Sequence, residues 1–343
     1  MLGSPAVAMP DRQDSTHVQL VLELLLESGA DYTSGEALSG KLGLSRTAVW
    51  KMVNVLRDRG YGIEAVPSRG YRLLRVPDRL STLELLPLLE THDLGRTLHA
   101  FDSLGSTSEY AFRLATEGAE HGELVVAEQQ TAGRGRRGRS WSSPAGKNLY
   151  ASLVLRPELP PQRAPELTLL GAVAVAETLG VEGVEARIKW PNDLQVQGRK
   201  IAGILTELSA EADRVHFVVL GIGVNLNAEA SDFPPELRED ATSVLRLRGT
   251  PVDRPAFTAR LLRTLEEWLD RHAEEGFAPI RQRWRALSAT LGQEILVKSE
   301  HRELRGVAED IDTDGALILR TEQGKERILA GDVEQVRSRL RPT

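Results

Sequence analysis

The chain contains no cysteine among its 343 residues. Disulfides, thiolate metal sites and a cysteine nucleophile are therefore excluded. The seven histidines are scattered and show no His-Glu-x-x-His or similar spacing, so we expect no structural metal site. A Gly-x-x-x-x-Gly-Lys-Ser/Thr sequence is also missing, which excludes a P-loop.

Long hydrophobic runs are missing as well, and no apolar stretch approaches the length that spans a bilayer. Residues 1–15 lack the basic start and apolar core of a signal peptide, so we expect a short flexible tail there. These absences favour a cytoplasmic protein without a membrane partner. With 41% hydrophobic and 27% charged residues, the chain has the composition of a globular protein, and its length fits two or three domains.

The charge of the chain is unevenly distributed. Its net charge of −6 argues against nucleic-acid binding by the whole surface. Residues 41–79, however, contain nine basic residues against three acidic ones, a local charge of +6. A surface that faces phosphates needs such a concentration of positive charge.

The basic segment lies in a pattern typical of a helix-turn-helix. Residues 17–28 carry a helical apolar stripe, and residues 33–36 have the spacing of a capping box that opens a second helix. After a turn at residues 43–44, Ser45 is expected to cap a third helix. The apolar positions of that helix predict its buried face: Val49, Met52, Val53 and Leu56.

The outer face of the third helix is basic and able to form hydrogen bonds, and it also carries Arg57. Strands at 62–66 and 71–74 flank a turn with Arg69 at its tip, which predicts a wing. The residues predicted to contact DNA are Arg46, Thr47, Trp50, Lys51, Asn54 and Arg69. The alternative is a plain three-helix packing domain with a solvated basic face, in which Trp50 covers the edge of the core. Residues 76–79 form a linker, which places the DNA-binding domain at 16–76.

A loop rich in glycine and arginine follows a predicted strand at 124–129. Residues 133–138 match the Gly-x-Gly-x-x-Gly dinucleotide fingerprint, but that fingerprint requires a helix directly after it. The sequence Ser-Ser-Pro-Ala-Gly at 142–146 cannot form this helix, so we reject a dinucleotide site. Mobile glycines and planar arginine donors suit a loop that closes over a phosphorylated or adenylated ligand. A solvated basic loop and a second nucleic-acid patch are the alternatives.

Three later stretches present polar residues at the ends of strands. Residues 187–193 end in Lys-Trp-Pro-Asn-Asp, and residues 199–207 contain a lysine and, inside the strand, Gly203. Residues 215–225 end in Gly-Ile-Gly-Val-Asn. A glycine within a strand often marks the close approach of a ligand. Taken singly, each stretch also has an ordinary interpretation as a turn, an edge-strand lysine or a strand end.

Together the four motifs resemble those of the bifunctional biotin protein ligases, also called biotin operon repressors. They are Gly-Arg-Gly-x-x-Gly-Arg-x-Trp at 133–141, Lys-Trp-Pro-Asn-Asp at 189–193, Lys-x-x-Gly-Ile-Leu at 200–205 and Gly-Ile-Gly-x-Asn at 221–225. Their order and spacing agree with the family, and the resemblance extends from about residue 17 to the C-terminus. It implies an α+β fold with a winged helix-turn-helix, a central α/β ligase domain at 81–280 and a C-terminal SH3-like β-barrel at 284–343. The central domain is expected to contain a mixed sheet and to be class II synthetase-like.

The resemblance implies an ATP-dependent ligase. Biotin and ATP, with Mg²⁺, would give biotinyl-5′-adenylate and pyrophosphate, and the biotin would pass to a lysine of the biotin carboxyl carrier protein of acetyl-CoA carboxylase. The adenylate would also favour a homodimer that binds palindromic operator DNA. A non-catalytic biotin sensor would lose catalysis, and a lipoate-type ligase is not expected to combine this loop with a DNA-binding domain. The intact Lys200 and arginine loop argue against the sensor.

The resemblance also assigns residues. The implied biotin contacts are Ser106, Thr107, Ser108, Gln130, Arg134, Gly135, Arg136, Lys200 and Gly203. The implied nucleotide contacts are Arg136, Arg139, Trp141, Lys189, Asn192, Asp193 and Asn225. The implied catalytic residues are Lys200, Arg134 and Arg136. Two departures stand out: Ser108 replaces the asparagine of the family, and residues 240–245 lack the aromatic residue that covers the adenine in some relatives.

Overall fold

The computed structural model describes residues 12–298, 302–329 and 331–335. The chain divides into two compact units, Met1–Asp78 and Arg79–Thr343. The division lies between Asp78 and Arg79, in the segment 76–79 that the sequence analysis describes as a linker. Each unit has its own core, and each is described by itself.

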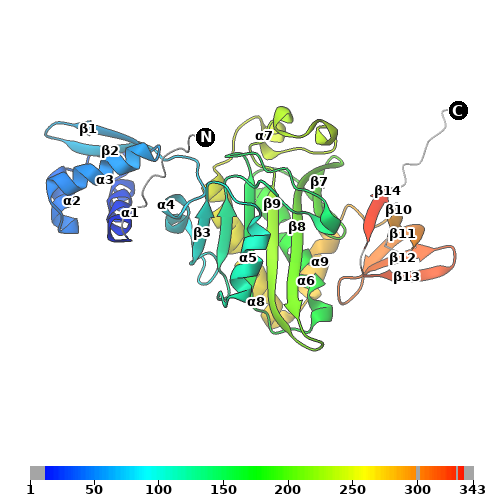
Figure 1. Cartoon of the computed structure of the whole chain (residues 1–343). Helices are drawn as coiled ribbons and strands as arrows, with labels where there is room; N and C mark the ends of the chain where they lie inside the picture. The colour runs from blue at the N-terminus through cyan, green and yellow to red at the C-terminus, as the bar shows by residue number, and fades with distance from the viewer. Residues whose placement is uncertain (1–11, 299–301, 330, 336–343) are drawn as a thin grey trace, which may run out of the picture. The chain divides into compact units, whose positions relative to one another are not determined.

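The first unit contains three helices followed by a β-hairpin. They are α1 (Arg12–Glu27), α2 (Gly35–Leu42), α3 (Arg46–Asp58), β1 (Gly62–Val66) and β2 (Gly70–Arg75). Ser45 caps α3, and Gly43 adopts a left-handed conformation with a φ of 66°. The predicted inner face of α3 is buried. The helix-turn-helix and its wing are therefore confirmed as structure (Figure 1).

Two details of the N-terminal prediction are wrong. Helix α1 already begins at Arg12, so the expected tail over residues 1–15 is too long; residues 1–11 lie outside the described residues. The cap of α2 is Ser34 rather than Thr33, because the Ser34 hydroxyl accepts from the backbone N–H of Ala37. The carboxylate of Glu36 instead pairs with Arg46 of α3 at 2.8 Å.

The second unit is built on a seven-stranded mixed sheet with the order β3-β4-β5-β9-β8-β7-β6. Only the β3–β4 pair is parallel among these neighbours. The strands are β3 (Leu98–Phe101), β4 (Leu124–Ala127), β5 (Leu149–Leu155), β6 (Arg187–Lys189), β7 (Asp193–Val196), β8 (Arg199–Ala210) and β9 (Val215–Val224). The helices are α4 (Thr82–Leu85), α5 (Thr107–Thr116), α6 (Pro165–Val181), α7 (Val244–Arg248), α8 (Arg254–Glu275) and α9 (Ala278–Leu287).

The two faces of this sheet differ because successive side chains of a strand point to opposite sides. On β9, Leu220, Ile222 and Val224 join the main core, which helices α6, α8 and α9 cover. Helix α5 lies over the other face (Figure 1), where Phe217 and Val219 pack against it. On that second face the end of β9 presents only glycine at positions 221 and 223. Because these glycines have no side chains, they leave room for a cavity on this face, next to the start of α5.

Helix α6 corrects the expectation about apolar runs. Residues Pro161–Val181, which include α6, have the length and hydropathy of a membrane-spanning helix. However, 72% of the most apolar window is buried inside the protein. The hydrophobicity of α6 is that of a central core helix covered by the sheet on one side and by α8 and α9 on others.

The C-terminal strands form an antiparallel sheet with the order β13-β12-β11-β10-β14. They are β10 (Glu294–Lys298), β11 (Glu303–Ile311), β12 (Leu317–Thr321), β13 (Gly324–Ile328) and β14 (Asp332–Gln335). The sheet belongs to the second compact unit and shares its core, since Ile295 and Leu317 lie in the same hydrophobic cluster as Leu169 of α6. The indole N–H of Trp190 also donates to the carbonyl of Gly315 at 3.2 Å.

Candidate functional site

A cavity of about 330 Å³ lies on the glycine-bearing face of the central sheet. Its wall comes from β8, β9, the arginine loop and the segment 189–193, which are the four motifs of the sequence. It also receives residues of β14. The structure thus brings together motifs that lie up to 90 residues apart in the chain, and every predicted biotin or nucleotide contact except Ser106 lines this one cavity.

Three glycines of β8 and β9, Gly203, Gly221 and Gly223, form the floor of the cavity. A Cβ atom on Gly223 would come within 2.6 Å of the Trp141 ring, and one on Gly203 within 3.1 Å of it. A Cβ on Gly221 would lie 2.5 Å from the Ser108 hydroxyl. Glycine is therefore required for the indole and the hydroxyl to approach the strands this closely. The Trp141 indole N–H is buried without a hydrogen-bond partner among the described residues.

A chain of hydroxyl and amide groups lies at one end of the cavity, where its members Thr107, Ser108 and Gln130 form part of the wall. Ser152 donates to the Thr107 hydroxyl at 2.9 Å, and its oxygen lies 3.1 Å from that of Ser108. Thr107 donates to the amide oxygen of Gln130 at 3.1 Å, and Gln130 donates to Ser143 at 2.9 Å. Sequence reasoning missed Ser152, although a serine inside the otherwise apolar and fully buried strand β5 is a signal for a polar site.

Ser106 has a different position from the one expected. Its hydroxyl accepts from the backbone N–H of Glu109 at 3.4 Å and caps α5. The cap fixes the start of the helix whose first turn carries Thr107 and Ser108. In this structure Ser106 supports the polar end of the cavity without lining it.

The arginine loop is a compact turn. Arg134 and Ser140 form a β-bridge, and the N–H of Gly135 donates to the carbonyl of Arg139 at 2.7 Å. A single short 3-10 turn at Arg136–Gly138 interrupts it, and residues 142–148 form no helix, which agrees with the rejection of a dinucleotide site.

The four arginines of the loop contact three different parts of the second unit. Arg134 lies 3.5 Å from the Glu207 carboxylate, and Arg136 donates to Asn192 Oδ1 at 3.1 Å. Arg137 and Arg139 both pair with Asp332 of β14. Burial lowers the pKa of Arg136, although nearby carboxylates partly oppose this effect. Asp332 was missed from the sequence because it lies 195 residues from Arg137.

The lysine and amide side chains are held by the protein as well. Lys200 Nζ lies 2.6 Å from Asp193 Oδ1 and 5.2 Å from the centre of the Trp141 ring. The amide of Asn192 donates to the Ile204 carbonyl at 2.8 Å, and that of Asn225 donates to the Thr242 carbonyl at 3.1 Å. Carboxylates and carbonyls thus orient the cation and the amides toward the cavity.

The other end of the cavity is apolar. Phe233, Leu237 and Ala241 line it, and Phe233 and Ala241 are buried in a small cluster. The sequence analysis found no aromatic residue at 240–245; the ring at this end comes from Phe233, seven residues earlier. Because the chain folds back between 229 and 241 through two short 3-10 turns, Ala230–Asp232 and Pro235–Leu237, the ring reaches the cavity.

The first unit presents a separate basic surface on α3 and the wing. Arg46, Thr47 and Lys51 are exposed, and Trp50 is 53% exposed, so its ring does not cover the core. Asn54 is partly buried, where it accepts from Arg57 at 3.3 Å. The prediction that Arg57 faces outward is wrong, because its guanidinium donates to the Ile63 carbonyl of β1 at 2.8 Å.

Arg69 at the tip of the wing is exposed and stacks on an aromatic ring. Its guanidinium lies 4.1 Å from the centre of the Tyr32 ring. The Tyr32 hydroxyl donates to Glu64 at 2.5 Å, and Glu64 also pairs with Arg72 at 2.7 Å. Arg72 is thus ion-paired with Glu64, whereas the guanidinium of Arg69 lies against the Tyr32 ring at the exposed tip. Arg69 is therefore placed to contact a phosphate backbone.

Comparisons with known proteins identify three regions. Residues 100–225 match the biotin/lipoate A/B protein ligase family, residues 290–335 the biotin protein ligase C terminal domain, and residues 17–72 an HTH domain. The bifunctional ligase/repressor BirA of Bacillus subtilis is 42% identical over 317 residues, covering 92% of this chain and 97% of that protein. The BirA of Escherichia coli is 36% identical, covering 90% and 93%. The biotin protein ligase of Aquifex aeolicus, solved with biotin and ATP, superposes with a TM-score of 0.62 at 29% identity, covering 71% of this chain and all of that one.

Proposed function

The chain belongs to the bifunctional ligase/repressor family of biotin protein ligases, and from this premise we propose how it acts. It makes biotinyl-5′-adenylate from biotin and ATP, and transfers the biotin to a lysine of the biotin carboxyl carrier protein of acetyl-CoA carboxylase. It also represses transcription in response to biotin, in the cytoplasm. The observation that carries the ligase is the single cavity in which Lys200 and the arginine loop face a glycine floor beside a hydroxyl chain.

The polar end of the cavity is the proposed site for the biotin ring. A ureido group needs both donors and acceptors, and the hydroxyl chain supplies both within a buried environment. Ser108 is shorter than the asparagine of the family, and its hydroxyl, 3.1 Å from that of buried Ser152, is the group we propose to bond the ring in place of the missing amide. The proposed biotin contacts are Thr107, Ser108, Gln130, Arg134, Gly135, Arg136, Lys200 and Gly203, with Ser106 as their support.

The apolar end of the cavity is the proposed site for the adenine. Phe233 and Leu237 offer an apolar wall there. The proposed nucleotide contacts between the two ends are Arg136, Arg139, Trp141, Lys189, Asn192, Asp193 and Asn225. Three carboxylates line the cavity, those of Asp193, Asp240 and Asp332, but the described residues form no cluster that could hold a metal by themselves. We therefore propose that Mg²⁺ enters with the phosphates of ATP, where it would neutralise part of their charge.

The adenylation step needs positioning and positive charge rather than a covalent enzyme intermediate. A carboxylate oxygen of biotin forms a bond to the α-phosphorus, and the bond to the leaving pyrophosphate breaks with its electron pair on pyrophosphate. Lys200 and Arg136 exchange their present acceptors, Asp193 and Asn192, for oxygens that gain charge in this step. In the transfer step a neutral lysine amine attacks the biotinyl carbonyl, AMP leaves, and the amine releases a proton.

The repressor function rests on the first unit. The exposed face of α3 enters the major groove, and Arg69 of the wing contacts the backbone. The adenylate favours a homodimer, so that two winged helices bind the two halves of a palindromic operator. We further propose that the C-terminal sheet is an SH3-like barrel and that the central unit is related to the class II synthetases.

Substitution of Lys200 tests the ligase. Purified protein is mixed with biotin, ATP and Mg²⁺, and pyrophosphate release and biotin transfer to a carrier domain are followed. Since Lys200→Ala removes a cation that stabilises developing charge, we expect both rates to fall by about 100-fold or more. Circular dichroism checks that the variant is folded. Biotin binding by the wild type without adenylate formation would indicate a non-catalytic biotin sensor, and a wild type that fails to bind biotin would contradict the assignment to the ligases.

A further inference from the structure

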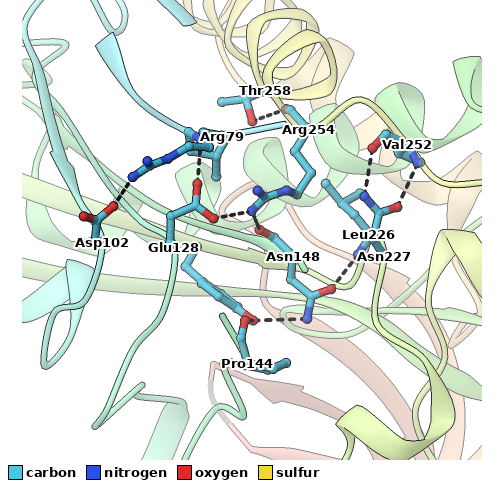
Figure 2. A network of polar contacts seen from close by, with 12 residues as sticks. Arg79, Asp102, Glu128, Pro144, Asn148, Leu226, Asn227, Val252, Arg254 and Thr258 are labelled. Atoms are coloured by element: carbon cyan, nitrogen blue, oxygen red, sulfur yellow. Dashed lines mark hydrogen bonds and ion pairs between the residues drawn. The ribbon is translucent and has the colours of Figure 1, made fainter. Parts of the chain in front are cut away.

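A buried ion pair lies behind the cavity and takes no part in the chemistry proposed above. Arg254 at the start of α8 is 1% exposed, and its guanidinium donates to Glu128 at 2.8 Å and to the Asn148 carbonyl at 3.3 Å (Figure 2). Burying a charge costs free energy, and a cation at a helix N-terminus is also disfavoured by the helix dipole. In other proteins, replacing a buried ion pair by well-packed apolar residues is often neutral or stabilising. The placement therefore calls for a reason other than stability.

Glu128 and Asn148, which both contact Arg254, lie at the two ends of the arginine loop. Glu128 directly follows β4 and stands two residues before Gln130, where the loop begins. Asn148 directly precedes β5, where the loop ends. The backbone N–H of Gly146 donates to the Glu128 carbonyl at 3.1 Å, which closes the base of the loop. The guanidinium of Arg254 thus connects the two ends of the loop that carries Arg134, Arg136 and Arg139.

The Asn148 side chain extends the network to the far wall of the cavity (Figure 2). Its amide donates to the Tyr150 hydroxyl at 3.1 Å, and that hydroxyl donates to the Pro144 carbonyl at 3.0 Å. Its oxygen accepts from the backbone N–H of Leu226, the residue after Asn225, at 3.0 Å. Both the exit of the arginine loop and the end of the Gly-Ile-Gly-Val-Asn motif are therefore fixed to the same buried group.

The second carboxylate oxygen of Glu128 holds the beginning of the ligase unit. It accepts from the backbone N–H of Leu80 at 2.6 Å. Leu80 is the second residue of the unit, next to Arg79, whose guanidinium pairs with Asp102 (Figure 2). A single carboxylate consequently joins the loop, α8 and the point at which the chain enters the ligase unit.

We propose that Glu128 and Arg254 are positioning residues that hold the arginine loop over the cavity. The inference rests on the proposed ligase function. Neither residue is expected to touch biotin or ATP. They act by fixing the two ends of the loop and the adjacent Gln130. Because this pair already orders the loop in the free protein, the binding of biotin does not have to provide the free energy of ordering it. Loss of the pair should therefore weaken biotin binding while the chemistry of the bound complex is kept.

The experiment removes both charges together. Glu128→Gln alone leaves the Arg254 charge buried and can unfold the chain, so it is combined with Arg254→Met. Tyr150→Phe is a milder second variant, which removes only the hydroxyl that holds Pro144. The control is Glu166→Gln, because Glu166 is also a carboxylate paired inside the protein, with Arg163 and His272, but it lies at the start of α6, on the face of the sheet opposite the cavity.

Two readouts separate positioning from mere support of the fold. The first is the KM for biotin and the kcat of pyrophosphate release. In the double variant we expect KM to rise by about tenfold or more and kcat to stay within about threefold, as for a loss of uniform binding. Tyr150→Phe should raise KM in the same direction by about threefold. The second readout is the rate of tryptic cleavage between residues 134 and 139 without biotin, located by mass spectrometry, which should increase in both variants.

The control variant and the wild type distinguish a failure of the positioning proposal from a failure of the proposed ligase function. Glu166→Gln should lower Tm but leave the KM for biotin and the loop cleavage rate unchanged. Unchanged KM and cleavage in the folded variants would overturn the proposal, as would an equal rise of KM in the control. If the double variant does not fold, Arg254→Lys replaces it, because a lysine keeps the charge but lacks the guanidinium fork that donates to both Glu128 and the Asn148 carbonyl, and both readouts should change in the same direction. A wild type without adenylation would refute the ligase function, and the cleavage rates, which need no turnover, would still decide whether the loop is held by this pair.

Discussion

At the scale of single residues, the cavity combines cations that are already oriented with positions that tolerate no side chain. Lys200 and Arg136 contact Asp193 and Asn192, acceptors that phosphate or carboxylate oxygens can replace without moving the backbone. Gly223 lies under the indole of Trp141. Position 223 therefore requires a residue without a Cβ atom, which only glycine provides.

Gly223→Ala tests that requirement. The added methyl group would lie 2.6 Å from the Trp141 ring, so the indole must leave the floor and narrow the cavity. We expect kcat/KM for biotin to fall by about tenfold or more, with a change in unfolding free energy of about 1 kcal/mol or less, because the ring can shift. Pyrophosphate release and urea denaturation measure the two effects. Gly180→Ala is the control: its methyl group meets nothing within 4 Å, and activity should be unchanged.

At the scale of elements, the two faces of a helix or strand have different roles: one packs into the core, and the other is exposed to the cavity or the surface. Strand β9 buries aliphatic side chains against α6 and offers glycines to the cavity on its other side. Helix α3 buries an apolar side and exposes a basic one. The hairpin of β1 and β2 presents Arg69 against Tyr32. One face of each element stabilises the fold, and the other face is available for a ligand.

The wing is predicted to contribute one phosphate contact through Arg69. Binding of the full chain to a 40-base-pair duplex of random sequence is measured by fluorescence anisotropy at several salt concentrations, because phosphate contacts do not depend on sequence. We expect Arg69→Ala to weaken binding and to reduce the slope of log K against log salt by about one. Arg305→Ala, an exposed arginine of β11, should have no effect. An unaltered slope in Arg69→Ala would remove the wing from the interface.

Helices α6 and α8 are joined by a carboxylate whose protonation affects stability. Burial by itself would raise the pKa of Glu166, but hydrogen bonds with His272 and Arg163 outweigh it and hold that pKa below the ordinary 4.5. A lowered pKa in the folded state stabilises the fold above the unfolded pKa, and this contribution is lost as pH falls through the folded value. Urea denaturation should show Glu166→Gln less stable than the wild type by about 3 kcal/mol at pH 7. The difference should shrink below pH 4.5; a constant difference would speak against the ion pair as its cause.

At the scale of the whole molecule, two compact units are joined in one chain. The first unit carries the basic surface, and the second carries the cavity to which both its central and C-terminal sheets contribute. On the proposed palindromic operator, two associated chains would bind both half-sites at once and would gain affinity. Control of association by the adenylate would connect the two functions without any contact between the cavity and DNA.

The association state is predicted to follow adenylate formation. Sedimentation velocity of the wild type should show a shift from monomer toward dimer when biotin, ATP and Mg²⁺ are added together. Lys200→Ala should show no such shift under the same conditions, since it makes little adenylate. Adding preformed biotinyl-5′-adenylate to the wild type should reproduce the shift. A sedimentation coefficient that is the same with and without these ligands would rule out ligand-controlled dimerisation.

The sequence by itself determined the winged helix-turn-helix and the four motifs that meet at the cavity. These features depend on short-range rules: caps such as Ser45, apolar spacing along α3, and glycines inside β8 and β9. Each of these signals can be read from a few neighbouring residues. The resemblance to the ligases rested on the same local motifs and on their order along the chain.

Only the tertiary structure decided which other residues join them. Ser152, Phe233 and Asp332 line or support the cavity, whereas Ser106 is used as a helix cap. The pair of Glu128 and Arg254 spans 126 residues, and Arg137 reaches Asp332 across 195. Neither partner of such a pair carries a local signal, because the contact is created by the packing of strands and helices that are distant in the chain. The sequence therefore identified the chemistry, and the packing selected the side chains that hold it in place.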